Sequence, residues 1–310
     1  MLIEAGILFL GLALLYAGSE FLVRGAASTA LILAIRPVVV GLTVVALATS
    51  APELLVSLVA SVKGAGGISV GNILGSNVIN IALVLGISAM IKPISIDRQI
   101  VRFDLPYMLG ISVVFWILCM DGHIGFADGI LLLVLLSLFL LVGIKNSKKK
   151  NGAKPVVKSS PRAIAINCTF MLVGLVGLAK GAQMVVQSAI VMARGIGLTE
   201  AFIGISVVAL GTSLPELATS AVAASRGESD LSVGNVIGSN IFNICLVMGA
   251  VGVLNPMIVE KKLLTFEFPF MVLIAIILAI IALGKGRMGR KTGLGLILFF
   301  VFFILVAYFK

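Results

Sequence analysis

Long apolar segments separated by short polar ones follow one another along the whole chain of 310 residues. A helix needs about 20 predominantly apolar residues, with a range of about 17–25, to cross a bilayer. By this measure the chain holds ten segments: residues 3–23, 37–62, 69–91, 104–120, 125–144, 163–187, 200–224, 231–254, 264–283 and 292–309. The pattern therefore predicts an all-α membrane protein with ten transmembrane helices.

The second half of the chain repeats the first at an offset of 163 residues. Residues 41–54 (GLTVVALATSAPEL) and 204–217 (GISVVALGTSLPEL) are identical at ten of fourteen positions. Each repeat holds five segments, an odd number, so the second copy must enter the membrane with the opposite topology. We therefore expect two inverted-topology five-helix repeats, 1–145 and 163–310, joined by a basic cytoplasmic linker at 146–162.

A proline interrupts the second predicted helix at Pro52 and the seventh at Pro215. Proline lacks an N–H, and its ring collides with the carbonyl four residues back, so both helices should break there. The break should free carbonyls around Ala46 to Thr49, and equivalently from Ala209 in the second half, which are cation ligands of the kind found in discontinuous transporter helices. The Thr-Ser pair before each proline is expected to cap the half-helix that follows.

An acidic residue follows each proline, at Glu53 and Glu216. Pro52 and Glu53 lie about 15 residues beyond Pro37, or roughly 22 Å at about 1.5 Å per residue, in the middle third of the membrane. Intramembrane carboxylates are costly and are generally functional. Oxygen-bearing groups of the broken helices and of the third and eighth helices complete the predicted ion site: Glu53, Glu216, Thr49, Ser50, Thr212, Ser213, Ser76, Ser239, Asn80, Asn243 and the carbonyls of Ala46 and Ala209.

These ligands are all hard oxygen donors, without histidine or cysteine, so zinc and copper are disfavoured. Ca²⁺ takes roughly 6–8 oxygens, and two glutamates would balance its charge. Na⁺ can use the same ligands. Since two unpaired glutamates in the membrane would be unfavourable without a cation or protons, release of one ion should be coupled to binding of another. The sequence thus predicts an antiporter that carries Ca²⁺ and Na⁺ and needs no cofactor.

The motifs ALATSAPEL and GNILGSN, with GTSLPEL and GNVIGSN in the second half, resemble the two signature repeats of the cation/Ca²⁺ antiporter superfamily. More narrowly, they resemble the prokaryotic Na⁺/Ca²⁺ exchangers. The resemblance implies Na⁺-driven Ca²⁺ movement by alternating access, with the two glutamates on Ca²⁺ and the hydroxyl side chains mainly on Na⁺. It also implies that the first and sixth helices slide across the other eight. Glycines would permit this close contact: Gly11, Gly18, Gly174, Gly177 and Gly181.

The chain departs from many relatives at the two amides of the predicted site. Many relatives carry an aspartate at one of the positions held here by Asn80 and Asn243. K⁺-dependent members resemble one another in having an acid at the second position, so Asn243 argues against K⁺ co-transport.

The net charge of +10 is unevenly distributed. Seventeen of the 23 Lys and Arg residues fall on one predicted side of the membrane and five on the other. By the positive-inside rule the first side is cytoplasmic, so both termini of this cell-membrane protein should be extracellular. The basic linker should lie near anionic lipid headgroups. Nucleic acid is not an expected partner, because no recognition module accompanies the charge. The short linker leaves no room for a large cytosolic regulatory domain, and a monomer is compatible with the arrangement.

Other interpretations stay open at this point. The same fold could perform Ca²⁺/H⁺ antiport, with the glutamates carrying protons, and two broken helices could also form a gated cation channel. A membrane scaffold would not need midplane acids. An enzyme is the least favoured class, since no nucleophile–base pair appears. Asn72 and Asn235 are expected to cap helices, whereas Asn77 and Asn240 could either contact an ion or only shape the site.

Overall fold

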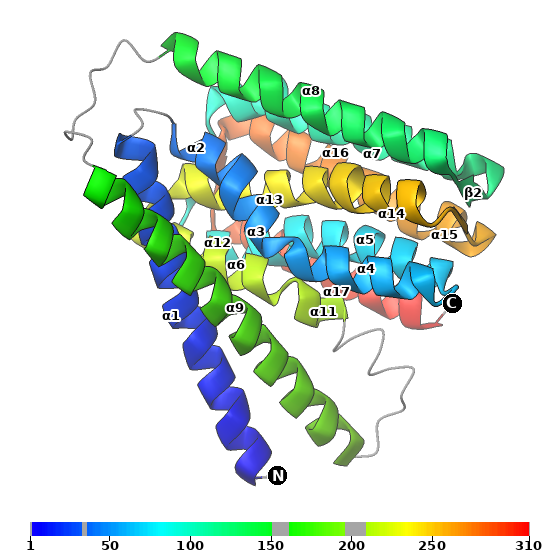
Figure 1. Ribbon diagram of the computed structural model, residues 1–310, viewed down its shortest axis with the longest axis horizontal. Helices are drawn as coiled ribbons and strands as arrows, with labels where there is room; N and C mark the ends of the chain where they lie inside the picture. The colour runs from blue at the N-terminus through cyan, green and yellow to red at the C-terminus, as the bar shows by residue number, and fades with distance from the viewer. Residues whose placement is uncertain (1, 33–35, 151–160, 196–208, 310) are drawn as a thin grey trace.

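The computed structural model describes residues 2–32, 36–150, 161–195 and 209–309, which are mostly helical (Figure 1). Eight helical segments within these ranges are long and apolar enough to cross a membrane, or nine if the bent pair Pro37–Thr49 and Ala51–Val62 forms one span. The predicted segment 200–224 is described only from Ala209 onward, and its first residues lie outside the described part. Ten spans therefore stay a prediction.

The first half begins with a long helix and continues with shorter helical segments that often follow one another without a loop. Their bounds are α1 (Leu2–Ile32), α2 (Pro37–Val40), a π-helical turn (Gly41–Val45), α3 (Ala46–Thr49), α4 (Ala51–Val62), α5 (Gly66–Ile79), a π-helical turn (Asn80–Val84), α6 (Leu85–Ile91), β1 (Ile94–Ser95), a π-helical turn (Ile100–Asp104), α7 (Leu105–Leu118), a 3₁₀ turn (Cys119–Asp121), β2 (His123–Ile124) and α8 (Phe126–Lys150).

The second half follows the same order. Its described elements are α9 (Pro161–Gly195), α11 (Ala209–Thr212), α12 (Leu214–Arg226), α13 (Ser229–Phe242), a π-helical turn (Asn243–Met248), α14 (Gly249–Leu254), β3 (Met257–Ile258), α15 (Lys261–Thr265), α16 (Glu267–Lys285), β4 (Arg287–Met288) and α17 (Arg290–Phe309). The π-helical turns after α5 and α13 begin at Asn80 and Asn243, two of the predicted ligands.

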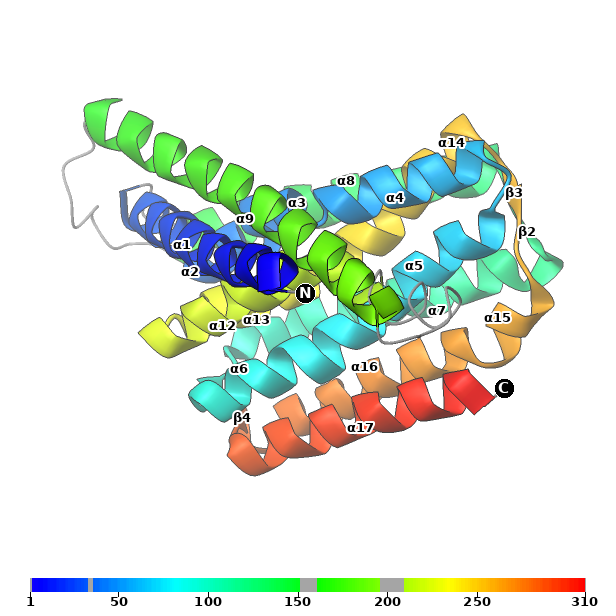
Figure 2. The ribbon, with the colours of Figure 1, turned by 90° about the horizontal axis from the view of Figure 1, so that it is seen from below.

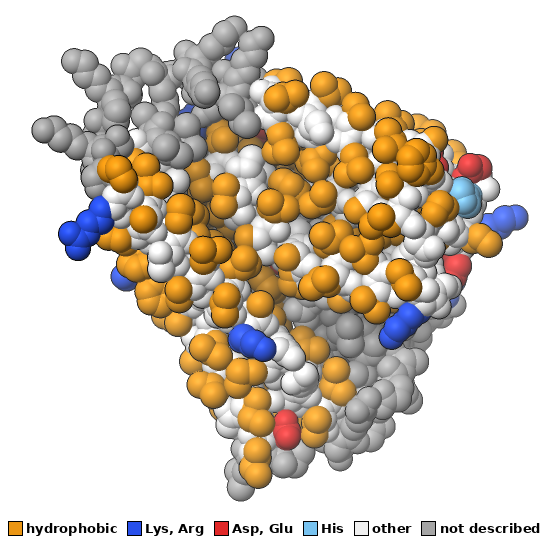
Figure 3. All heavy atoms as spheres, viewed as in Figure 1, with side chains coloured by type: hydrophobic (Ala, Val, Ile, Leu, Met, Phe, Trp, Pro, Cys, Tyr) orange, Lys and Arg blue, Asp and Glu red, His pale blue; other side chains and the backbone are white. Residues whose placement is uncertain are grey.

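Two membrane spans form the centre of the molecule. In the spans Gly66–Ile91 and Ser229–Leu254, 78% and 83% of the residues in the most apolar stretch are buried, against 44% or less in the other single-helix spans described. Their hydrophobic side chains form the main core together with α7, α8, α16 and α17. The described part of the face in Figure 3 is largely apolar, and its charged side chains lie mostly toward the margins. An apolar exterior around a centre that contains polar side chains fits a protein surrounded by lipid.

Helices α1 and α9 pack closely on each other and run oblique to the remaining helices (Figures 1 and 2). Glycine makes this contact possible, because a Cβ at Gly18 would lie 2.8 Å from the carbonyl oxygen of Gly174, and one at Gly181 would lie 2.8 Å from that of Gly11. The backbones therefore touch directly, as small residues allow in membranes. The pair is tied to α12 by Glu20, which forms ion pairs with both Arg24 and Arg226.

The structure corrects three expectations about the elements. Four two-residue strands interrupt the all-α plan, since β1 pairs with β4 and β2 with β3, both antiparallel. The helix expected at 3–23 continues to Ile32 as α1. The helix expected at 125–144 continues to Lys150, because the lysine-rich start of the predicted linker contains no helix breaker before Gly152.

Candidate ion-binding site

The chain breaks at equivalent serines in the two halves, Ser50 and Ser213. α3 ends at Thr49, and α4 begins at Ala51 with Pro52 in its first turn, so the two helical parts are bent by 43°. α11 ends at Thr212, and α12 begins at Leu214 with Pro215 in its first turn. The predicted breaks are thus present where the prolines require them.

The carbonyl of Ala46 was expected to be freed by the break, but it keeps a helical hydrogen bond. It accepts a hydrogen bond from the backbone N–H of Ser50 at 2.9 Å. Pro52 instead deprives the carbonyl of Ala48 of its usual helical donor. Ala46 can still offer its second lone pair to a cation, since a carbonyl oxygen has two. Ala209 begins α11, and the residues before it lie outside the described part.

The serines at the breaks do not cap the following helices, which corrects a second expectation. Neither Ser50 nor Ser213 makes a side-chain cap hydrogen bond. The Ser50 hydroxyl instead donates to Glu216 Oε1 at 3.4 Å, and the Ser213 hydroxyl donates to Glu53 Oε1 at 3.4 Å. Each break therefore serves the carboxylate of the opposite half.

Both glutamates are fully buried, with 0% of their surface exposed. They lie in the first turns of α4 and α12, where the positive ends of the helix dipoles favour negative charge. The two carboxylates are close enough to interact electrostatically. Among the described residues, Glu53 Oε2 and Glu216 Oε2 each lack a hydrogen-bond partner. Buried carboxylate oxygens without a partner are costly, and a bound cation would relieve that cost.

Hydroxyl side chains surround each carboxylate. Thr49 and Ser239 lie beside Glu216, and the Thr49 and Ser239 hydroxyl oxygens are 3.3 Å apart. Thr212 lies beside Glu53. Ser76 Oγ is buried and has no partner among the described residues. The structure thus brings together hydroxyl groups from α3, α11 and α13 with carboxylates from α4 and α12.

Four asparagines connect the two central spans in a reciprocal network. Asn77 Nδ2 donates to the backbone carbonyl of Asn240 at 3.4 Å, and Asn240 Nδ2 donates to that of Asn77 at 3.3 Å. Since a carbonyl can only accept, these contacts leave the Oδ1 atoms of both residues as acceptors. They accept from Asn243 Nδ2 at 3.2 Å and from Asn80 Nδ2 at 3.0 Å, respectively.

This network determines the direction in which the two predicted amide ligands face. With their NH₂ groups committed to Asn77 and Asn240, Asn80 and Asn243 must present their oxygens on the other side. Both Oδ1 atoms are buried and lack a partner in the described part of the chain. Asn77 and Asn240 thus hold the two predicted amide ligands in place, which supports a shaping role, although each Oδ1 keeps a second lone pair.

Asn72 and Asn235 do not cap helices, contrary to expectation. They lie inside α5 and α13, and their NH₂ groups donate to the hydroxyls of Ser57 at 3.0 Å and Ser220 at 2.9 Å. Neither Ser57 nor Ser220 is among the predicted site residues. The repeat could have revealed them, since Ser57 and Ser220 are separated by 163 residues, as Asn72 and Asn235 are.

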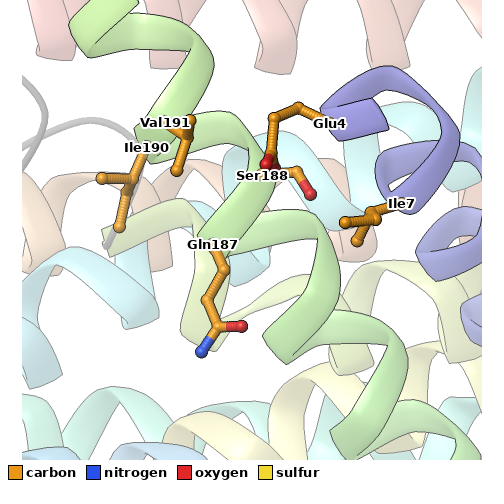
Figure 4. A pocket seen from close by; sticks show the side chains of 6 residues that line it. All are labelled: Glu4, Ile7, Gln187, Ser188, Ile190 and Val191. Carbon is orange, nitrogen blue, oxygen red and sulfur yellow. The ribbon is translucent and has the colours of Figure 1, made fainter. Parts of the chain in front are cut away.

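The assembled groups are all hard oxygen donors with two formal negative charges. No cluster of three or more His, Cys, Asp or Glu side chains suited to a metal occurs among the described residues, so the two carboxylates act with neutral oxygens only. Such a set matches the preference of Ca²⁺ and other hard cations. A separate cavity of about 520 Å³ lies between α1 and α9, lined by Glu4, Ile7, Gln187, Ser188, Ile190 and Val191 (Figure 4), and includes none of the site residues.

Buried carboxylates beside hydroxyl and amide oxygens, in a helical membrane protein, fit the class of cation transporters. The chain is a member of the sodium/calcium exchanger protein family, whose family model matches residues 3–145 and again residues 167–309. The family is one of transporters, not of enzymes.

Relatives cover nearly the whole chain. The inner membrane protein YrbG of Escherichia coli is 35% identical, over 94% of this chain and 93% of its own. The sodium/calcium exchanger MaX1 of Methanosarcina acetivorans is 31% identical, over 98% of both chains. A solved structure of the sodium-calcium exchanger NCX_Mj, soaked with Na⁺ and Sr²⁺, is 32% identical, covers 98% of both chains and superimposes with a TM-score of 0.86.

Proposed function

We propose that this protein exchanges Na⁺ for Ca²⁺ across the membrane by alternating access. The observation that carries the proposal is the pair Glu53 and Glu216, buried together and each left with one oxygen that no described residue satisfies. Ca²⁺ bound between them would neutralise both carboxylates. Once Ca²⁺ leaves, the charges require replacement by other cations, and this requirement couples the two ion movements.

The proposed site divides by charge into a centre and two flanks. The centre lies between the carboxylates, with the oxygens of Asn80 and Asn243 as neutral ligands, and suits a divalent ion. Each flank combines one carboxylate with hydroxyl groups, such as Thr49 and Ser239 beside Glu216. One negative charge with neutral oxygens suits a monovalent ion such as Na⁺. Ser50, Ser76, Thr212, Ser213 and the carbonyls of Ala46 and Ala209 complete these flanks.

The proposed architecture is that of ten helices in two inverted repeats, 1–145 and 163–310, with 146–162 between them and both termini outside. Reciprocal contacts between equivalent residues support it, as in the exchange of hydrogen bonds between Asn77 and Asn240. The close, glycine-lined contact of α1 with α9 supports movement of this pair against the rest.

Flux into proteoliposomes tests the exchange. We expect an outward Na⁺ gradient to drive uptake of ⁴⁵Ca²⁺ in the absence of a pH gradient, and replacement of internal Na⁺ by K⁺ to abolish it. Uptake driven only by a proton gradient would replace this proposal with Ca²⁺/H⁺ antiport by the same site. Rapid Ca²⁺ flux down its own gradient without any counter-ion would indicate a channel instead.

A further inference from the structure

Two asparagine amides, one buried and one partly buried, stand next to the proposed site without facing its centre. Asn235 on α13 is fully buried, and its NH₂ group donates to Ser220 at 2.9 Å. Asn72 on α5 is its counterpart 163 residues earlier, and its NH₂ group donates to Ser57 at 3.0 Å and to the backbone carbonyl of Glu53 at 3.4 Å. Because a carbonyl can only accept, the latter contact fixes which end of the Asn72 amide is the donor.

The oxygen of each amide accepts a hydrogen bond from a threonine of the opposite half. Thr49 Oγ1 donates to Asn235 Oδ1 at 3.2 Å, and Thr212 Oγ1 is 3.5 Å from Asn72 Oδ1. Each asparagine thus links a serine of its own half to a threonine that borders a carboxylate.

The Thr49 hydroxyl has one proton and several acceptors within reach. Besides Asn235, the Glu216 carboxylate lies beside it and the Ser239 hydroxyl oxygen is 3.3 Å away. The carbonyls of Val45 and Ala46 lie at 3.2 and 3.3 Å from its oxygen. Threonine inside a helix commonly donates to the carbonyl three or four residues back. If the proton pointed to Ala46, it would occupy the lone pair that this carbonyl can offer to a cation. Donation to Asn235 leaves both the Ala46 carbonyl and the hydroxyl lone pairs available.

We propose that Asn235, and Asn72 in the other half, are positioning residues that set the direction of the Thr49 and Thr212 hydroxyls and thereby the affinity for Na⁺. The inference rests on the proposed exchange and adds to it a determinant of monovalent binding. The effect falls on Na⁺ because the threonines lie on the single-carboxylate flanks, whereas Ca²⁺ is held between both glutamates. Neither asparagine touches an ion in this account.

Two kinds of flux in the same vesicles separate the effects. Na⁺-driven ⁴⁵Ca²⁺ uptake depends on Na⁺ binding, whereas exchange of internal Ca²⁺ for external ⁴⁵Ca²⁺ without Na⁺ does not. For Asn235→Leu, which removes the acceptor at similar size, we expect the Na⁺ concentration at half-maximal rate to rise about tenfold, the change that loss of one hydrogen bond can produce. Ca²⁺/Ca²⁺ exchange should stay within about twofold of wild type by the same argument, since its ligands are unchanged.

Two further variants distinguish the proposed effect from a general packing defect. Ser220→Ala leaves Asn235 in place but removes the acceptor of its NH₂ group, so the Na⁺ shift should have the same direction and smaller size. If Asn235→Leu does not insert into the membrane, the Na⁺ requirement of Ser220→Ala tests the proposal in its place. Asn255→Leu is the matched control, because Asn255 likewise donates to a serine hydroxyl, that of Ser61 at 2.8 Å, away from the site. It should change neither flux.

A double-mutant cycle with Thr49→Val asks whether Asn235 acts through that hydroxyl. In the Thr49→Val background, adding Asn235→Leu should raise the Na⁺ requirement no further. Additive effects, an equal fall of both fluxes, or an unchanged Na⁺ requirement in Asn235→Leu would each overturn the inference. Absence of Na⁺-driven uptake in the wild-type protein would instead overturn the proposed function itself.

Discussion

The chemistry of this protein is concentrated in a small number of polar side chains that the apolar spans bury completely. Glu53 and Glu216 have no exposed surface, and each receives a hydroxyl hydrogen bond from the break in the other half. Neither half alone therefore supplies a complete environment for its own carboxylate. At this scale the two repeats depend on each other, because each one completes the surroundings of the other's carboxylate.

Removal of either carboxylate should abolish Ca²⁺ exchange. For Glu53→Gln and Glu216→Gln we expect losses on the order of a hundredfold or more, because leaving a buried charge without its partner costs roughly 3–5 kcal/mol. Membrane insertion and yield should be normal. Glu260→Gln, at an exposed glutamate before α15, is the matched control and should transport like wild type. A glutamine variant with full flux would remove that residue from the site.

A third carboxylate at the centre should make transport depend on pH or K⁺. In Asn243→Asp an oxygen would replace the NH₂ group that donates to Asn77 Oδ1 at 3.2 Å, so two acceptors would face each other. A proton or an additional cation would relieve this repulsion. We therefore expect flux closest to wild type at acidic pH, or stimulation by K⁺, measured as ⁴⁵Ca²⁺ uptake across a pH series with and without K⁺. Indifference to both would contradict the orientation of the asparagine network.

The candidate ligand residues could be selected from the sequence because prolines and acids stand out in apolar segments, and the repeat places them twice. Their hydrogen bonds could not. Ser50 and Ser213 have the residue type and position of helix caps, yet their hydroxyls serve glutamates of the other half. Asn72 and Asn235 also looked like caps, but α5 begins at Gly66, six residues before Asn72. Which partner a short polar side chain chooses depends on the packing of the halves, which local sequence does not encode.

At the scale of elements, the contact between α1 and α9 is made by glycines whose neighbours leave no room for a side chain. Gly18→Ala would place a Cβ 2.8 Å from both the Gly174 oxygen and the Leu178 nitrogen, so the helices would have to separate. Overpacking of this kind costs roughly 1–3 kcal/mol.

We expect Gly18→Ala to slow Na⁺/Ca²⁺ exchange several-fold, on the order of the rate change that such a cost allows, and to lower the thermal stability measured in detergent. Gly6→Ala is a control on the same helix, since a Cβ there meets nothing within 4 Å. Equal flux and stability in the two variants would show that close approach of α1 and α9 is not required.

Helix positions followed from the apolar pattern, but several boundaries and all four strands did not. α1 extends to Ile32 because its polar residues also adopt the helical conformation. Arg24, for example, forms an ion pair with Glu20 one turn earlier in the same helix. The strands contain only two residues each and form because loops from opposite halves meet, as Ile94 does with Met288. Pairing of that kind is determined by the assembled helices and leaves no periodicity in the sequence to detect.

At the scale of the whole molecule, the distribution of basic residues sets the expected orientation. On a cysteine-free background, a single cysteine at Arg290 should be protected from an impermeant thiol reagent in intact cells, and one at Lys261 should react. Both should react after permeabilisation. The natural Cys119 and Cys245 are buried and Cys168 is exposed, so their replacement is needed for a clean signal. The reverse labelling pattern would place the termini in the cytoplasm.

The central claim is that Glu53 and Glu216 together bind one Ca²⁺, which Na⁺ displaces. Equilibrium binding of ⁴⁵Ca²⁺ to the purified protein tests it most directly. We predict saturable binding of one ion per chain that falls with increasing Na⁺ and disappears in Glu53→Gln and Glu216→Gln, whereas K⁺ has no effect. Binding that survives in both glutamine variants, or that Na⁺ does not reduce at any concentration, would contradict the account.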